Sequence, residues 1–180
     1  MQLKNVLIAA SMALTASAAG NSTNTTDIAP TIQNRLAGLE LGYLHTEIIL
    51  AQLRDSTEDV TADDVVRTYL KTISAEDQAL DKPQPARPLS ESTQLVLCQA
   101  FHSLTVTGLR LDNALVNNVN QFNQTQRDEI LSGVDRVSDE TSRFYDDVAS
   151  NALTYCVKTV QTDNNALLES FAMVQDAYSQ

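Results

Sequence analysis

Glycine and proline are scarce over the second half of this 180-residue chain. From residue 89 to residue 180 there is no proline, and the only glycines are Gly108 and Gly133. These residue types mark the turns between strands, so their scarcity is unusual for a protein built of strands and turns. We also find no convincing strand pattern and no internal repeat apart from a shared helical periodicity. The sequence therefore favours an all-α protein.

Catalytic, phosphate-binding and metal-binding signatures are also missing. There is no Gly-x-Ser-x-Gly elbow, no Gly-rich phosphate loop and no zinc-finger spacing. The two histidines, His45 and His102, form neither a Glu-x-x-His nor a His-x-x-x-His pair that could hold a metal. Acidic pairs such as Asp63-Asp64 are acid–base partners in one interpretation, and charges at a helix N-terminus or on solvated faces in another. We predict a protein that is not an enzyme and uses no metal or cofactor.

Basic residues are few. The chain has 12 Lys and Arg against 23 Asp and Glu, a net charge of −11 at pH 7. A balance this acidic disfavours nucleic acid and anionic membrane surfaces as partners. The length fits one domain with a substantial core, and we expect a monomer.

The first 18 residues have the layout of a secretory signal peptide. Lys4 precedes the apolar run Val6–Leu14, and the small residues Ala16-Ser17-Ala18 follow as a cleavage site. The run is too short to cross a bilayer, which needs about 20 apolar residues. We therefore predict a removed signal peptide over residues 1–18 and an extracellular protein without a membrane span. The alternative is a buried N-terminal helix.

A polar tail over residues 19–29 follows, and the predicted domain covers residues 30–180. The tail contains two glycosylation sequons, at Asn21 and Asn24, and a third lies at Asn123. Three sequons after a signal peptide predict a secreted glycoprotein.

The chain has only two cysteines, Cys98 and Cys156. In the oxidising secretory pathway a single pair most simply forms a disulfide. If the helical turns lie near residues 122–126 and 152–153, both thiols fall at nearly one height in a bundle. Equal height is necessary for a Cα separation below about 7 Å, but it does not fix the side-chain directions. Two unpaired buried thiols are the alternative.

Helix start and stop signals divide the N-terminal half. Pro30 opens a helix that continues to Arg54, and Thr61-Ala62-Asp63-Asp64 has the form of a capping box for a second helix. The segment Lys82–Pro88 holds three prolines and cannot be helical. It therefore connects an N-terminal helical pair to the C-terminal half.

Three successive apolar seams with coiled-coil-like spacing follow this connection. Their members are Leu97, Phe101, Leu104, Leu111, Leu115 and Phe122; Ile130, Val134, Val137, Thr141, Phe144 and Val148; and Leu153, Val157, Val160, Asn164, Leu167, Phe171, Val174 and Tyr178. Each seam needs partners to be buried. We predict a single-domain bundle of about five amphipathic helices, of which the C-terminal three run up and down.

Gly108 lies among large apolar residues on the first of these seams. It either lets two helices approach closely or leaves space for an apolar ligand, with Asn164 as a polar contact. The candidate ligand site consists of Phe101, Leu104, Gly108, Leu111, Val137, Phe144, Asn164, Leu167 and Phe171.

Three segments, Leu95–Leu104, Asp112–Val116 and Phe171–Tyr178, resemble the fungal hydrophobic surface-binding protein A family, also called cell-wall galactomannoproteins. The resemblance in pattern and length covers most of residues 30–180. It implies a secreted, all-helical fungal protein, associated with the cell wall, that adsorbs to hydrophobic surfaces or holds fatty acids between its helices.

We interpret the chain as a non-enzymatic bundle that binds hydrophobic small molecules, such as a fatty acid or lipid, or hydrophobic surfaces. The alternative is a secreted inhibitor or effector-like module that binds another protein through an outer helical face. A void lined by seam residues favours the first function. A filled core beside an exposed apolar patch favours the second.

Overall fold

The computed structural model describes residues 28–56, 59–80 and 89–180. Over these ranges the chain contains helices and no strand, which confirms the predicted all-α bundle. The long helices are α1 (Ile28–Asp55), α2 (Ala62–Leu80), α3 (Glu91–Asn117), α4 (Gln124–Phe144) and α6 (Val157–Tyr178). Three short elements complete the described chain: η1 (Val119–Gln121), the π-helical η2 (Tyr145–Ala149) and α5 (Ser150–Ala152). The predicted signal peptide, the sequons at Asn21 and Asn24 and the proline-rich connection lie outside the described residues.

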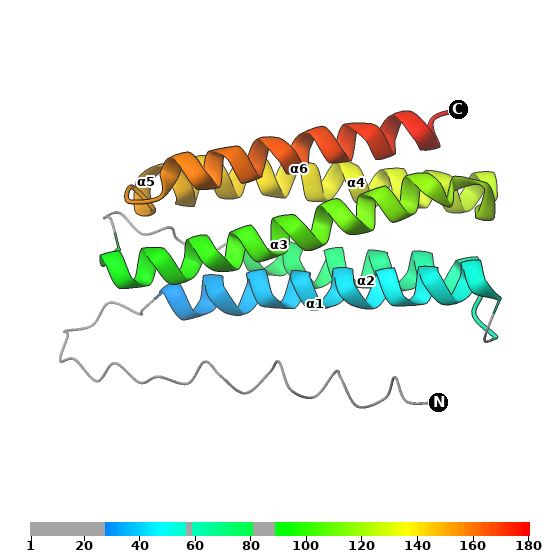
Figure 1. Ribbon diagram of the computed structural model, residues 1–180, viewed down its shortest axis with the longest axis horizontal. Coiled ribbons are helices and arrows are strands. Elements are labelled where there is room, and N and C mark those ends of the chain that lie inside the picture. The colour runs from blue at the N-terminus through cyan, green and yellow to red at the C-terminus, as the bar shows by residue number, and fades with distance from the viewer. Residues whose placement is uncertain (1–27, 57–58, 81–88) are drawn as a thin grey trace.

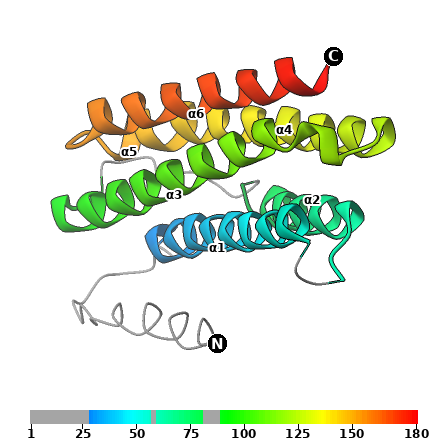
Figure 2. The same cartoon turned by 45° about the vertical axis from the view of Figure 1, so that its right-hand side comes forward.

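The five long helices lie side by side along one axis (Figure 1). α1, α3 and α6 run in one direction, and α2 and α4 run in the other (Figure 1). α3 packs against α1 and α6, while α4 packs against α2 and α6. Because α1 and α2 also pack together, the contacts between the five helices form a closed ring. Figure 2 shows the same helices from a second direction. The predicted up-and-down course of the C-terminal three helices is therefore confirmed.

The seams predicted from periodicity fill the interior of this ring. Most of their members are at most 6% exposed, including Leu115, Ile130 and Val174 at 0%. The rings of Phe101 and Phe144 stack with centroids 5.2 Å apart, so α3 and α4 meet through side chains in the core. Burying one such side chain contributes about 1.5–3 kcal/mol, so these seams provide the main stabilisation of the bundle.

The last helix begins later than its seam predicted. Leu153 has φ −110° and ψ 42°, and α6 starts at Val157, whose side chain is only half-buried. Leu153 is nevertheless fully buried in the connection before α6. A buried apolar residue in a connection and one in a helix give the same local pattern, so periodicity placed this boundary too early.

The capping box predicted at Thr61 is present. The Thr61 N–H donates to Asp64 Oδ2 at 3.0 Å, and the Asp64 N–H donates to Thr61 Oγ1 at 3.3 Å. The hydrogen bond from the Thr61 hydroxyl and that from its backbone lower the pKa of Asp64. The acidic residues of this first turn therefore have a structural role at the start of α2.

Cys98 and Cys156 form a disulfide, with their Cα atoms 6.5 Å apart. Cys98 lies in α3, and Cys156 immediately precedes α6, as the turn positions predicted. No helix in the described ranges combines the length and apolar character needed to cross a bilayer.

Candidate functional site

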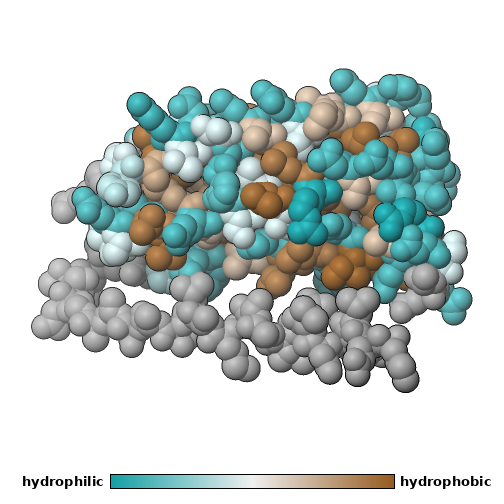
Figure 3. Space-filling model, viewed as in Figure 1, coloured by the Kyte–Doolittle hydropathy of each residue, from teal (hydrophilic) through white to brown (hydrophobic). Residues whose placement is uncertain are grey.

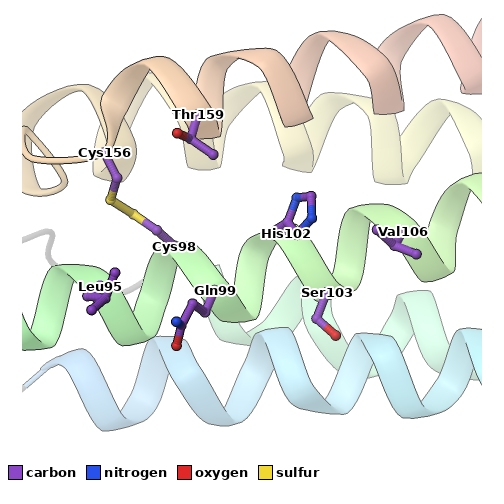
Figure 4. A pocket seen from close by; sticks show the side chains of 8 residues that line it. All are labelled: Leu95, Cys98, Gln99, His102, Ser103, Val106, Cys156 and Thr159. Atoms are coloured by element: carbon purple, nitrogen blue, oxygen red, sulfur yellow. A yellow bond between two sulfur atoms is a disulfide. The ribbon is translucent and has the colours of Figure 1, made fainter.

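An open groove of about 520 Å³ lies on the outer surface between α3 and α6. The disulfide crosses from α3 to α6 beside it, and the His102 ring points toward α6 (Figure 4). The lining residues are Leu95, Cys98, Gln99, His102, Ser103, Val106, Cys156 and Thr159.

The groove has a mostly apolar surface, and its lining contains no acidic residue, although the molecule is strongly acidic. Leu95 and Val106 line it and are 48% and 45% exposed, and most of its surface is apolar. None of its lining residues is Asp, Glu, Lys or Arg, although the chain has a net charge of −11. On the face that includes α3, hydrophobic patches interrupt the hydrophilic surface (Figure 3). Exposed apolar side chains that gather in one hollow mark a binding surface more specifically than single exposed residues do.

Gln94 fixes the end of the groove nearest the disulfide. Its side chain is 3% exposed, and its Nε2 donates to the Leu89 carbonyl at 2.6 Å. Its Oε1 accepts from the Tyr155 N–H at 2.7 Å. Because both ends of the amide are used, the start of α3 and the chain entering α6 are held together beside the disulfide.

His102 is held by a carboxylate that local sequence spacing did not predict. Its Nδ1 lies 3.0 Å from Asp163 Oδ1 on α6. The side chains are 60% and 10% exposed, so Asp163 is covered while His102 faces the groove. Such a contact fixes the orientation of the imidazole ring.

The hydroxyl group next in sequence does not extend this pair into a catalytic relay. The Ser103 Oγ donates to Glu40 Oε1 on α1 at 2.6 Å. In a nucleophilic relay the hydroxyl would instead donate to the free nitrogen of the imidazole. Among the described residues there is also no group of three or more His, Cys, Asp and Glu side chains that could hold a metal ion.

The residues predicted to form an internal ligand site lie together in the core. Phe101, Leu104, Gly108, Leu111, Val137, Phe144, Asn164, Leu167 and Phe171 are all buried. The space expected beside Gly108 is, however, filled: a Cβ built there would lie 2.8 Å from Leu167 Cδ2 and 3.5 Å from Tyr43 Cε2. Gly108 therefore serves close packing of α3 against α6 and α1, which is the first of the two roles that the sequence left open.

Asn164 has a buried Oδ1 without a hydrogen-bond partner in the described part of the chain. The sequence had placed this residue on a seam as a polar contact for a ligand. It is 5% exposed, within the packed interior. Among the residues that the structure describes, no space for a ligand is seen beside Asn164, so the outer groove is the better candidate for ligand binding.

The sequence analysis also missed a buried carboxyl group. Asp112 on α3 is 2% exposed and accepts a hydrogen bond from the Ser170 hydroxyl on α6. Burial raises the pKa of Asp112 to about 7, although the bond from Ser170 lowers it in part. The signal was a second inward stripe on α3, made of Thr105, Gly108 and Asp112 at helical spacing.

Comparisons with models of protein families, with curated proteins and with solved structures gave no match for this chain.

Proposed function

We propose that this protein is a non-enzymatic binding module that holds an apolar group in the groove between α3 and α6. The observation that carries the proposal is the mostly apolar lining, without Asp, Glu, Lys or Arg, of a hollow on an acidic molecule. Apolar lining with a few polar groups is typical of sites for small hydrophobic ligands. A fatty acid or another lipid is the first candidate, and a hydrophobic surface presents the same chemistry.

The dimensions of the groove support an elongated ligand. Leu95 and Val106 are 11 positions apart on one helix, which corresponds to about 16 Å along its axis. Gln99, His102 and Thr159 add polar atoms along the same lining. An acyl chain lying along α3 would contact both exposed apolar side chains and leave its head group near a polar one.

Binding to another protein is the second candidate. Tyr155, at the groove end held by Gln94, is 64% exposed, and aromatic residues are enriched in protein interfaces. The core beside Gly108 is filled, and apolar side chains are exposed outside it. These are the features that favour a protein partner over an internal ligand site.

We also propose that the protein is secreted and glycosylated, and associated with the cell wall. The disulfide is compatible with an oxidising compartment, and Asn123 is exposed at the start of α4. The Asn123 Oδ1 accepts from the Gln126 N–H at 3.0 Å, so a glycan on its nitrogen leaves this helix cap in place.

A fluorescent fatty-acid probe, titrated into the secreted protein, tests ligand binding. Leu95→Gln should weaken binding about tenfold, because it removes apolar contact area from the groove. Met173→Gln is the matched control: Met173 is also 48% exposed, but it does not line the groove. Equal binding by the two variants, or no binding by the wild-type protein, would contradict the proposal.

A further inference from the structure

Asp112 and Ser170 connect α3 and α6 inside the bundle. Farther along the same helix pair, the Tyr178 hydroxyl donates to the Leu115 carbonyl at 3.0 Å. These two contacts lie in the C-terminal half of α6, whereas the disulfide joins the chain to α3 immediately before this helix begins. The N-terminal end of α6 is therefore held covalently, and its C-terminal half is held by polar contacts and packing.

The phenol group of Tyr69 on α2 interacts electrostatically with Asp112. Tyr69 on α2 is 1% exposed, and its hydroxyl has no hydrogen-bond partner within the ranges that the structure describes. Burial raises the pKa of Tyr69, and Tyr43 on α1, Asp112 and Tyr178 raise it further. A phenol carries no positive charge, so none of these groups could balance a carboxylate.

Arg127 on α4 acts on a different group, Tyr178. Burial raises the pKa of Tyr178, and the charge of Arg127 on α4 partly offsets this effect. Burial raises the pKa of Asp112 and the Ser170 hydrogen bond lowers it, and no charged side chain among the described residues shifts it further. The His102–Asp163 pair lies on the same two helices toward the disulfide end.

We propose that Asp112 is a proton-dependent latch: neutral, it holds the C-terminal half of α6 against α3, and ionised, it loosens this contact. The physical reason is that an ionised carboxyl group in the interior is costly unless a cation compensates it. One hydrogen bond from Ser170 compensates only part of this cost. The inference concerns the bundle itself and does not depend on what binds in the groove.

The direction of the pH dependence follows from proton linkage. In the folded protein the Asp112 pKa is about 7, whereas its ordinary value is 3.8. The folded state therefore keeps a proton that the unfolded chain has released, and its advantage disappears as the pH rises through 7. For this group alone, the ratio of folded to unfolded protein should fall about a hundredfold between pH 5 and pH 8.

A carbon-13 NMR titration of the wild-type aspartate carboxyl groups tests the ionisation directly. The Asp112 signal should titrate with a midpoint near 7. A midpoint near the ordinary value for aspartate would overturn the proposal. This measurement needs no variant, so it decides even if substitutions at this buried position prevent folding.

Asp112→Asn then tests the consequence for the fold, because asparagine keeps the shape and an acceptor oxygen but cannot ionise. The variant should lose the fall in unfolding free energy between pH 5 and pH 8. Asp139→Asn, at an exposed position on α4, should keep it. Because the His102–Asp163 pair joins the same two helices, both variants should be compared in a His102→Gln background. Retention of the full pH dependence by Asp112→Asn would overturn the latch.

Ser170→Ala distinguishes a proton-dependent contact from a purely structural one. The Ser170 hydrogen bond stabilises the carboxylate, so its loss should move the midpoint of the Asp112 titration upward.

Hydrogen exchange adds a local measurement. When the pH is raised, the amides of residues 170–178 should lose more protection than those of residues 157–163. An unchanged midpoint, or equal loss of protection along α6, would contradict the proposal.

Discussion

Gly108 sets how closely α3 approaches its neighbours. With no side chain at this position, Leu167 and Tyr43 occupy the adjacent volume. Leu167 is 2% exposed, so it has little freedom to move away from a larger residue. If the facing side chain had been short, the same glycine would have left space for a pocket. The sequence of α3 alone does not show which side chain faces Gly108, so it could not distinguish close packing from a pocket.

Gly108→Leu should therefore lower the free energy of unfolding, by about 1–3 kcal/mol, because it overpacks the contact with Leu167. Thermal unfolding followed by circular dichroism measures the change. Gly38→Leu is the control, since Gly38 is exposed on α1 and leucine is the better helix former. A higher melting temperature for Gly108→Leu, with fatty-acid binding lost, would instead support an internal site.

At the scale of elements, Asn123 combines two roles at the start of α4. Its side chain accepts from the Gln126 N–H, and the Gln126 side chain accepts from the Asn123 N–H at 2.9 Å. This capping box satisfies two backbone groups that the helix leaves free. The same asparagine begins a sequon, so the glycan that we propose there would be attached to the residue that caps α4.

Asn123→Ala should cost about 0.5–2 kcal/mol of stability and also remove the glycan. Asn123→Asp should remove only the glycan, because aspartate caps a helix equally well. Intact mass of the secreted protein and its thermal unfolding separate the two effects. If the three masses differ only by the substitutions themselves, the sequon is unused. If Asn123→Ala melts at the same temperature as Asn123→Asp, the cap contributes little.

Helix periodicity predicted the elements well because each seam depends on neighbouring positions in one helix. Leu115, Ile130 and Val174 are all fully buried, as their seams required. His102 and Asp163 are 61 residues apart in the sequence. Their contact depends on how α3 and α6 align, and no local spacing contains that information. For the same reason the closed ring of helices and the groove between α3 and α6 could not be predicted.

The whole molecule is held by two different kinds of contact between α3 and α6. One is covalent, between Cys98 and Cys156, and closes a sequence separation of 58 residues. The other is the set of polar contacts that includes Asp112 and Ser170. Because the disulfide borders the groove, the stability of the bundle and the shape of the candidate binding surface depend on the same bond.

Replacement of both cysteines by serine should destabilise the bundle while leaving most of its helices intact. In the chain-entropy model a loop of this length stabilises the fold by about 4 kcal/mol, since the bond restricts the unfolded chain. For a domain of this size the melting temperature should fall by about 10 °C. Reduction of the wild-type protein should reproduce the loss, whereas a reductant should leave the serine variant unchanged. If the double serine variant melts at the same temperature as the oxidised wild-type protein, the disulfide adds no stability. Packing and Gln94 alone would then hold the start of α6.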